Sequence, residues 1–268
     1  MSDLSGKNLL ITGAGNGLGH AMALHLAGCG AQLVIADIDE PALAALSEKI
    51  QAISGNTPLS VVLDVSSEEQ WQAAASTIAQ QLGYLTGLVN NAGIMLHVPF
   101  QEMTLEQFRQ TLQVNVEGVF LGCQNCLPLL ELGAKEAGSS SIVNISSIFG
   151  HVAGLMHSAY AASKGAVNMF SKSLANELPR QGLNIRTNTV HPGVMSAGVS
   201  IAGTQAAIDR GVFSSAEEAG QVLMMGNPYG RPGQPEEIPG AIAFLLSDAS
   251  LLMNGAEITL DGGHTAVY

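Results

Sequence analysis

Short apolar runs alternate with longer helical patterns along the whole chain, and this alternation limits the possible fold more than any other feature of the sequence. Apolar runs that hardly alternate with polar residues are typical of parallel strands buried on both faces. The expected strands are 8–12, 32–36, 60–63, 87–90, 141–145, 185–190 and 257–260. Helical patterns fill the intervals, as at 18–29, 41–53 and 68–82. The sequence therefore predicts an α/β fold, a doubly wound parallel sheet of about seven strands with helices on both faces.

The 268 residues show no internal repeat and no shift in composition that would mark a linker, so we expect residues 1–268 to form a single domain. Segment 195–231 departs from the regular rhythm, being rich in Gly, Ser and Ala with scattered Met and Val. It would follow the carboxyl end of a late strand, where ligands bind in such folds. We therefore expect a lid over the site there, and a surface excursion without function is the alternative.

Charge and cysteine content exclude several classes of partner. Lys and Arg number 10 against 22 Asp and Glu, a formal net charge of -12 that would repel nucleic acid and anionic membrane surfaces. No apolar run is long enough to span a membrane. The three cysteines imply no disulfide framework, and with no signal peptide evident we expect a cytoplasmic location.

A glycine-rich turn follows the first expected strand and opens the first helix, with the sequence Thr-Gly-Ala-Gly-Asn-Gly-Leu-Gly at 12–19. Glycines at such a place permit close approach of the backbone, and the free N–H groups of the helix bind a pyrophosphate. The pattern Gly-x-Gly-x-x-Gly does not match, because His20 stands where the last glycine would be needed. A glycine turn without a ligand is the alternative at this point.

Asp37 ends the second expected strand, where a carboxylate accepts hydrogen bonds from the ribose hydroxyls of NAD and repels the extra phosphate of NADP. Neither Asn16 nor Ile38 offers the positive charge that a 2'-phosphate requires. A helix cap ahead of Pro41 is the alternative role for Asp37. The order of strand, turn, helix, strand and acid favours a dinucleotide site with NAD as the cofactor.

Tyr160 and Lys164 are four residues apart, which places both side chains on one face of a helix. By itself such a pair is common on protein surfaces. A nearby cation, together with the positive ring of oxidised nicotinamide, would lower the pKa of the phenol toward working pH, as a general base requires. Ser147, at the end of an expected strand, could hydrogen-bond the substrate oxygen.

These motifs together resemble the short-chain dehydrogenase/reductase family over nearly the whole chain and in the family's order. The stretches that carry the resemblance are 12–19, Asp64-Val65, Asn90 to Gly93, Asn115, Asn144 to Ser147, Tyr160 with Lys164, His191-Pro192-Gly193, 231–237 and Asp261-Gly262-Gly263. The resemblance implies one dinucleotide-binding and catalytic domain that transfers a hydride between NAD(H) and a secondary alcohol or ketone.

The resemblance also implies roles for individual residues. Tyr160 would exchange the hydroxyl proton, Ser147 would steady the substrate oxygen, and Lys164 would bind the nicotinamide ribose and lower the tyrosine pKa. Asn115 would hold a water that links Lys164 to solvent. The implied cofactor-binding residues are Gly13, Asn16, Gly17, Leu18, Gly19, Asp37, Ile38, Asp64, Val65, Asn91, Ala92, Gly93, Tyr160, Lys164, Pro192, Gly193 and Val194. Ser147, Phe149 and Tyr160 would contact the substrate.

Two stretches depart from the family pattern. Ala197 stands where relatives often carry a Thr that holds the carboxamide of the cofactor, and Ser196 or the backbone would have to replace it. The segment 132–140 reads as a loop longer than usual ahead of the fifth strand.

No metal is expected, because the histidines lack the spacing of metal ligands and the Cys123-x-x-Cys126 pair has no second pair. We expect the two cysteines to pack inside a helix. His97, His151 and His157 should fall in loops around the substrate, each more often a solvated loop residue than a catalyst.

The residues expected around the substrate are apolar and rich in methionine: Met95, Leu96, Phe149, Leu155, Met156, Met195 and Met225. Flexible thioethers suit irregular hydrophobic ligands, so we expect a bulky, cyclic or steroid-like secondary alcohol. Packing in the core or at a subunit contact is the alternative for these residues.

Two other functions remain open from the sequence. One is a 3-oxoacyl-thioester reductase of the same family, and the other is a non-catalytic NAD-binding regulatory or structural protein. By resemblance we also expect a homodimer or homotetramer, formed through the helices that carry Asn115 and Tyr160 and through the last strand.

Overall fold

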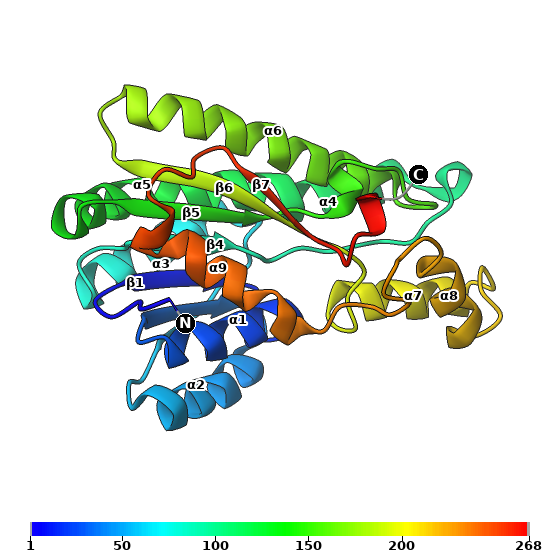
Figure 1. The fold of residues 1–268 in the computed structure, drawn as a ribbon, viewed down its shortest axis with the longest axis horizontal. Helices are drawn as coiled ribbons and strands as arrows, with labels where there is room; N and C mark the ends of the chain where they lie inside the picture. Colours follow the sequence, from blue (N-terminus) through cyan, green and yellow to red (C-terminus); the bar gives the residue numbers. More distant parts are fainter. Residues whose placement is uncertain (1, 267–268) are drawn as a thin grey trace.

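Seven parallel strands form one sheet in the order β3-β2-β1-β4-β5-β6-β7, in a computed structural model that describes residues 2–266 (Figure 1). The strands are β1 Asn8–Thr12, β2 Gln32–Asp37, β3 Leu59–Val62, β4 Gly87–Asn90, β5 Ser140–Ile145, β6 Ile185–Pro192 and β7 Glu257–Leu260. The order reverses direction between β1 and β4, which makes the carboxyl ends of these two strands the switch point of the fold. The predicted doubly wound parallel sheet is confirmed.

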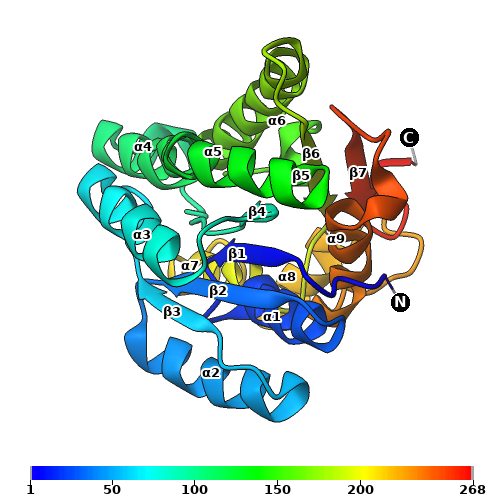
Figure 2. The same ribbon diagram turned by 90° about the vertical axis from the view of Figure 1, so that its left-hand side faces the viewer.

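Helices cover both faces of this sheet (Figure 2). The helices are α1 Gly17–Gly28, α2 Glu40–Ser54, α3 Glu68–Gln81, α4 Leu105–Leu112, α5 Gly118–Ala137, α6 Ser158–Arg180, α7 Val199–Asp209, α8 Ala216–Leu223 and α9 Pro239–Leu246. One core lies under α1, α2 and α9, and a second lies under α3, α5 and α6. No helix within residues 2–266 is long and apolar enough to cross a membrane.

Each central strand supplies side chains to both cores. In β1, Leu9 and Ile11 belong to the core under α1, whereas Leu10 belongs to the core under α5. All three side chains are at most 1% exposed. Burial of one such side chain stabilises the fold by about 1.5–3 kcal/mol, so a strand without polar alternation fits only a sheet covered on both faces.

Helix α5 runs without interruption to Ala137 and ends on Gly138, which has a φ of 82°. The expected long loop at 132–140 is therefore wrong, because most of it is the last turns of α5 and β5 begins at Ser140. Within these turns Gly133 packs directly on the chain ahead of β4, and a Cβ atom there would overlap the carbonyl oxygen of Leu85. This glycine serves close helix packing and does not break the helix.

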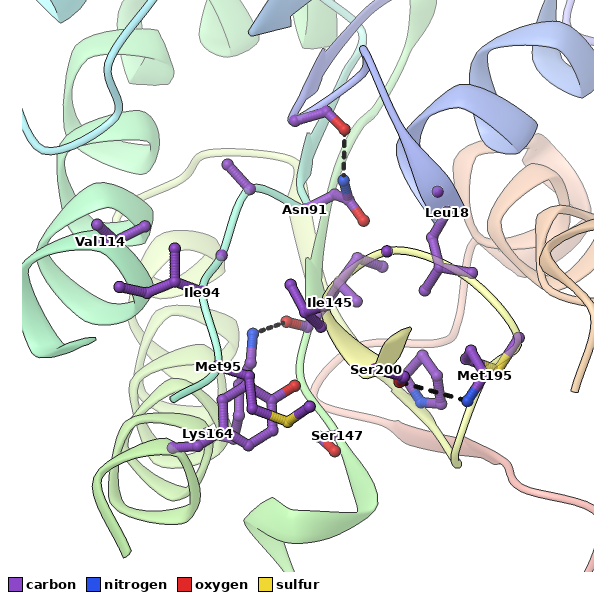
Figure 3. A pocket seen from close by; sticks show the side chains of 18 of the residues that line it. Leu18, Asn91, Ile94, Met95, Val114, Ile145, Ser147, Lys164, Met195 and Ser200 are labelled. Carbon is purple, nitrogen blue, oxygen red and sulfur yellow. Dashed lines mark hydrogen bonds between the residues drawn. The ribbon is translucent and has the colours of Figure 1, made fainter. Parts of the chain in front are cut away.

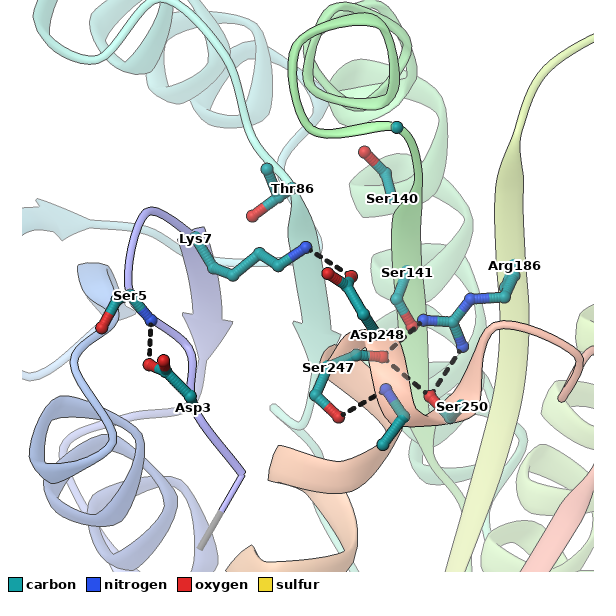
Figure 4. A network of polar contacts seen from close by, with 12 residues as sticks. Asp3, Ser5, Lys7, Thr86, Ser140, Ser141, Arg186, Ser247, Asp248 and Ser250 are labelled. Atoms are coloured by element: carbon teal, nitrogen blue, oxygen red, sulfur yellow. Dashed lines mark hydrogen bonds and ion pairs between the residues drawn. The ribbon is translucent and has the colours of Figure 1, made fainter.

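A polar network ties together the amino ends of the strands, opposite the switch point (Figure 4). Lys7, just before β1, forms an ion pair of 2.7 Å with Asp248, which follows α9. The buried guanidinium of Arg186 in β6 donates to Ser250 Oγ at 3.1 Å and to the Leu245 carbonyl oxygen at 3.0 Å. These contacts fix the first and last thirds of the chain to each other and leave the opposite end of the sheet free for a site.

Segment 195–231 contains α7 and α8, which lie beyond the carboxyl ends of the strands (Figure 1). A small apolar cluster of Ala207, Phe213 and Ala219 holds the two helices together. The segment is thus a folded unit with its own contacts, placed where a lid would have to be.

Candidate functional site

A cavity of about 590 Å³ opens at the carboxyl ends of the strands (Figure 3). Its walls come from the turn after β1, the end of β2, the loops after β4 and β5, the start of α6, and segment 195–231. Its volume falls within the range of ordinary ligand sites. The cavity therefore lies at the switch point, where the topology of the sheet predicts a ligand.

The glycine turn after β1 is shaped for close approach. Gly13 and Gly17 have φ angles of 64° and 53°, which other residues rarely adopt. A Cβ atom on Gly13 would lie 2.8 Å from the Cα of Ala92, and one on Gly19 would overlap the carbonyl oxygen of Gly13. Asn91 fastens the turn to the end of β4 by donating from Nδ2 to the carbonyl oxygens of Thr12 and Gly13, at 2.9 and 3.0 Å.

Helix α1 begins inside this turn, and Asn16 at its N-cap makes no side-chain hydrogen bond to the helix. The first N–H groups of a helix have no partner within the helix, so they are available to an anion at the cavity wall. This uncapped helix start and the glycine cradle fit the pyrophosphate of a dinucleotide. Gly13, Asn16, Gly17 and Leu18 line the cavity, whereas Gly19 lies behind the turn.

Asp37 reaches the cavity from the end of β2. Its carboxylate accepts hydrogen bonds from the backbone N–H groups of Gly15 at 2.8 Å and Asp39 at 3.1 Å. The helix cap at this point is Asp39, which accepts from the N–H of Ala42, so capping is not the task of Asp37. Among residues 2–266, Lys164 is the one Lys or Arg side chain that lines the cavity.

The other predicted cofactor residues also lie along this cavity. The members that line it are Ile38, Asp64, Val65, Asn91, Ala92, Gly93, Pro192, Gly193 and Val194. A Cβ atom on Gly193 would come within 2.9 Å of the Cα of Asp261, so the chain after β6 also depends on a glycine. The structure thus gathers into one groove residues that lie far apart in the sequence.

Ser147, Tyr160 and Lys164 meet at the inner end of the cavity, and all three are buried (Figure 3). Ser147 follows β5, and its Oγ accepts from the N–H of Phe149 at 3.2 Å. Tyr160 stands in the first turn of α6 and Lys164 one turn later. Lys164 Nζ donates to the carbonyl oxygen of Ile145 at 2.8 Å and lies 5.6 Å from the centroid of the Tyr160 ring.

Burial has the largest effect on the pKa values of Tyr160 and Lys164. It raises the pKa of Tyr160 to about 12, with the Ser147 hydroxyl offsetting part of the rise, and it lowers the pKa of Lys164 to about 8. Burial shifts both groups toward their neutral forms, because a charged group loses hydration in the cavity, but a pKa of about 8 leaves Lys164 mostly cationic at pH 7. The expected lowering of the tyrosine pKa therefore does not come from Lys164 in the free protein, and it stays a prediction for the cofactor-loaded site.

Asn115 lies outside the cavity wall, in a π-helical turn at Gln113–Glu117 between α4 and α5. Its side chain is fully buried; Oδ1 accepts from the N–H of Ile94 at 2.8 Å, and Nδ2 donates to the Ile94 carbonyl oxygen at 2.9 Å and to Ser163 Oγ at 3.0 Å. The side chain thus clamps the loop after β4 to α6. Its capacity for hydrogen bonds is nearly filled by protein, so a bound water would have to use the backbone of the π-helical turn.

His191 is a residue of the site that the sequence analysis missed. It is buried at the end of β6, with Nδ1 3.1 Å from the carbonyl oxygen of Ser147 and Nε2 2.8 Å from Thr189 Oγ1. Burial lowers the pKa of His191 to about 4, so the imidazole is neutral. It fixes the backbone of Ser147 from behind. The motif His-Pro-Gly was visible in the sequence, but the contact depends on β6 lying beside β5.

His191 also lies near His151 and Glu257, and their potential ligand atoms are within 4.8 Å of one another. Both nitrogens of His191 already contact Ser147 and Thr189, and Glu257 is paired with Lys172 at 3.0 Å. These contacts use the atoms that a metal would need. We therefore assign no metal role to the group.

His97 and His157 are not the solvated loop residues that we expected. Each is only 3% exposed, and both line the cavity near Tyr160. His151, in contrast, is exposed as expected. The burial of His97 results from packing against α7, a contact that the sequence pattern of the loop does not indicate.

The expected substrate residues divide into two groups. Met95, Phe149 and Met195 line the cavity, and Val199, Thr204 and Leu223 of segment 195–231 join them. The cavity wall does not include Leu96, Leu155, Met156 or Met225. Leu155 and Met225 are 73% and 74% exposed, so for these two the prediction of a place in the cavity is wrong.

Ala197 lines the cavity, but its methyl group offers no hydrogen bond to a carboxamide. Ser196 does not replace the missing hydroxyl, because its Oγ donates to Gln234 Oε1 at 2.8 Å and the residue lies outside the cavity wall. Ser200, on the first turn of α7, is the nearby hydroxyl that does line the cavity.

The two cysteines of the C-x-x-C pair are buried in α5 and free, as expected. Burial raises the pKa of the Cys123 thiol to about 12, which keeps it protonated and unreactive.

Comparison with known proteins identifies relatives that are dehydrogenases and reductases. Residues 13–265 match the model of a family described as enoyl-(acyl carrier protein) reductase. Trans-4-hydroxycyclohexanecarboxylate dehydrogenase of Sinomonas cyclohexanicum is 38% identical over 265 residues, covering 97% of this chain and 93% of that protein. Cyclopentanol dehydrogenase of Comamonas sp. (strain NCIMB 9872) is 35% identical over 266 residues, covering 99% and 100%. The crystal structure of levodione reductase matches with a TM-score of 0.89 and 31% identity, covering 99% of this chain and 100% of that chain.

The chain belongs to the short-chain dehydrogenase/reductase family, in agreement with the motifs of the sequence. It is an oxidoreductase that acts on a CH–OH group and uses a nicotinamide cofactor, NAD or NADP.

Proposed function

We propose that this chain is an NAD-dependent dehydrogenase that oxidises the secondary alcohol of an alicyclic or steroid-like compound, or reduces the matching ketone, with Tyr160 as general acid/base. The observation that carries the proposal is the meeting of Ser147, Tyr160 and Lys164 at the buried end of a cavity whose other end is built for a dinucleotide.

Each residue of the site has a separate role in the proposed reaction. Bound NAD supplies the hydride acceptor for the carbinol carbon. Tyr160 takes the hydroxyl proton during oxidation and returns it during reduction, and Ser147 holds the substrate oxygen beside it. Lys164, one turn along α6, binds the nicotinamide ribose and adds positive charge next to the phenol. Asn115 helps to position Tyr160 and Lys164 of α6, because its side chain joins α6 to the loop after β4 through Ser163 and Ile94.

Asp37 supports NAD as the cofactor. Its carboxylate is held at the cavity wall by two backbone N–H groups, and Lys164, at the far end, is the one Lys or Arg side chain of that wall. A 2'-phosphate at this place would meet a negative charge without a compensating cation.

The apolar part of the cavity wall favours an alicyclic substrate. Met95, Phe149, Met195 and Leu223 present apolar surface near the catalytic end. The names of two relatives point the same way, since one is a dehydrogenase of a hydroxycyclohexane compound and the other of cyclopentanol. A cyclic alcohol buries its ring against these side chains and leaves one oxygen for Ser147 and Tyr160.

A 3-oxoacyl-thioester reductase is the second candidate, and the acyl-carrier description of the matching family model favours it. Its substrate arrives on an anionic phosphopantetheine arm. The net charge of -12 and the acid at Asp37 are less suited to that substrate and to NADPH.

The test uses the purified chain with cyclopentanol, cyclohexanol, a 3-hydroxysteroid and a 3-oxoacyl thioester, each with NAD(H) and with NADP(H). We expect turnover of at least one cyclic alcohol with NAD. Tyr160→Phe should lower kcat by about 10³-fold or more and leave NADH binding unchanged, measured by its fluorescence. Unchanged turnover in Tyr160→Phe, or reduction of the thioester alone, would overturn the proposal.

A further inference from the structure

Two buried histidines form part of the cavity wall next to Tyr160. His97 lies in the loop after β4, and His157 lies just before α6. Their ring centroids are 4.3 Å apart at an angle of 74°, and the ring of His157 is 6.2 Å from that of Tyr160. The mechanism proposed above uses neither imidazole, although both are almost fully removed from bulk water.

The hydrogen bonds of His157 fix its tautomer. Its Nδ1 contacts the carbonyl oxygen of Leu155, and a carbonyl can only accept, so Nδ1 carries the proton. In a neutral ring Nε2 is then an acceptor. Burial lowers the pKa of His157 and keeps the ring neutral at pH 7.

Packing fixes the tautomer of His97. Its Nδ1 is buried without a hydrogen-bond partner among residues 2–266. This edge of the ring faces Gly203 of α7. A Cβ atom on Gly203 would overlap Nδ1 of His97. A proton on Nδ1 would be a buried donor without an acceptor, and such donors are rarer in folded proteins than acceptors without a donor. We therefore place the proton on Nε2, and burial, which lowers the pKa of His97 to about 4, keeps the ring neutral.

The backbone holds His97 in this position. Arg210, just after α7, donates to the carbonyl oxygen of His97 at 2.8 Å. The structure gives neither Nε2 atom of the two rings a hydrogen-bond partner within residues 2–266. The wall of the cavity thus holds one ring with a free donor and one ring with a free acceptor, with the ring centroids 4.3 Å apart. Polar atoms in a pocket that the protein itself leaves without partners are available to a ligand or a water.

We infer that His97 and His157 bind a second hydroxyl group of the substrate, so that the preferred substrate is an alicyclic diol. The hydroxyl would accept a hydrogen bond from Nε2–H of His97 and donate one to Nε2 of His157. A carbonyl group would satisfy the donor alone. A carboxylate would find no charged donor on either ring, because both rings are neutral. The inference rests on the proposed function, since the first hydroxyl must react at Tyr160.

The test compares the isomeric cyclohexane-1,2-, 1,3- and 1,4-diols with the methylcyclohexanols, in which a methyl group of similar size replaces the second hydroxyl. Trans-4-hydroxycyclohexanecarboxylate serves as the anionic probe. We expect kcat/KM for one diol to exceed that for the matching methylcyclohexanol by tenfold or more. Failure to form two hydrogen bonds to a buried hydroxyl accounts for a difference of this size.

Three variants assign the preference to the histidines. His97→Leu removes the donor, and His157→Asn keeps a donor for the Leu155 carbonyl but removes the acceptor. Both should reduce the preference for the diol to within about twofold while kcat/KM for the methylcyclohexanol stays within about threefold. His97→Gln, whose amide nitrogen can reach the place of Nε2, should restore part of the preference. The ratio between two substrates does not change when a variant merely loses active protein.

The outcomes separate the two proposals. Turnover of methylcyclohexanols without any preference for a diol, or a stronger preference for the carboxylate, overturns the inference and leaves the proposed function intact. A preference that survives in both His97→Leu and His157→Asn overturns the role of the histidines. If the wild-type chain oxidises none of these alcohols with NAD or NADP, the proposed function fails and this inference fails with it.

Discussion

At the scale of single residues, Asp37 shows how one side chain serves structure and selectivity together. Its carboxylate accepts the N–H groups of Gly15 and Asp39, which orient it at the cavity wall before any ribose arrives. A carboxylate that is already held in place loses little entropy when it binds a ligand, so its effect on cofactor choice should be large.

Replacement of Asp37 by Ser should therefore change the choice of cofactor. We expect kcat/KM with NAD to fall by about 10–100-fold, the value of one or two charge-assisted hydrogen bonds, and the ratio of NAD to NADP to fall further. The measurement is kcat/KM for one alcohol with each cofactor. Asp39→Ser is the matched control, because Asp39 caps α2 and lies outside the cavity wall. An unchanged ratio in Asp37→Ser would contradict the assignment of NAD.

The buried ammonium of Lys164 should make stability depend on pH. Burial lowers its pKa from 10.5 to about 8, so below pH 8 the folded chain bears the full cost of the buried cation. Between about pH 8 and 10.5 the folded chain has lost this proton and the unfolded chain still holds it. The free energy of unfolding therefore rises with pH in this window, by up to about 1.4 kcal/mol per pH unit. Tyr160, whose pKa is raised from 10 to about 12, opposes this only above pH 10.

Urea unfolding of the wild-type chain and of Lys164→Met at pH 7.5 and 9.5 isolates this contribution, because other titrating groups are common to both. From the lower to the higher pH, the difference in unfolding free energy should move in favour of the wild-type chain by about 1–2 kcal/mol. A difference that does not depend on pH would mean that Lys164 titrates outside this window. Lys164→Met should also be nearly inactive at either pH.

The set of Ser147, Tyr160 and Lys164 could be predicted from the sequence because these residues sit in ordered motifs next to recognisable strand and helix ends. His97 and His157 were expected in loops around the substrate but not as buried side chains, and His191 was not expected as a site residue. His191 acts through the pairing of β6 with β5, and His97 is buried only because α7 folds over it. Local sequence carries no signal for either contact.

At the scale of elements, a glycine inside a helix can report tight packing and not flexibility. Gly133 in α5 leaves no room for a methyl group next to the Leu85 carbonyl oxygen. Gly220 in α8 has no atom within 4 Å of the place of a Cβ, and its φ is not positive.

These two glycines should respond oppositely to replacement by Ala. Gly133→Ala should destabilise the chain by about 1–3 kcal/mol, because α5 must move away from β4. Gly220→Ala should be neutral or stabilise by up to about 1 kcal/mol, since alanine favours a helix. Thermal unfolding of both variants, followed by circular dichroism, measures the difference. Equal effects in the two variants would show that packing at Gly133 is looser than described.

The bounds of most strands follow closely from the short apolar runs in the sequence. The strands β1, β4 and β7 begin and end where predicted, and β2 and β5 are each one residue longer. The segment 132–140 was expected to be a loop, but it is helical up to Ala137 although it contains Gly133. Only the position of Leu85 in space shows why a glycine belongs in the helix there.

At the scale of the whole molecule, the homodimer or homotetramer remains a prediction. Helices α5 and α6 present apolar side chains to solvent, with Phe120 and Met169 44% and 67% exposed. Phe120 of α5 also packs against Phe170 of α6, with ring centroids 6.3 Å apart, so apolar side chains of the two helices lie side by side. Exposed apolar side chains on neighbouring helices favour association with a second copy of the chain.

Met169→Glu should weaken this association. We expect the mass measured by light scattering after gel filtration to fall toward that of the monomer, or the dissociation constant to rise by at least about tenfold. Met225→Glu is the control, because Met225 is 74% exposed and closely follows α8, a helix that lies apart from α6 in both views (Figures 1 and 2). A monomeric wild-type chain would contradict the prediction directly.

The central place of β1 has a consequence for synthesis on the ribosome. β1 pairs with β2 on one side, but its other neighbour, β4, begins only at Gly87. The side chain that closes the glycine turn, Asn91, is made just afterwards. A nascent chain therefore carries an apolar strand with one open edge until both have emerged, and closure between distant segments is slow. The earliest sequence motif of the cofactor site is thus among the parts that must wait for later residues before they can take their final shape.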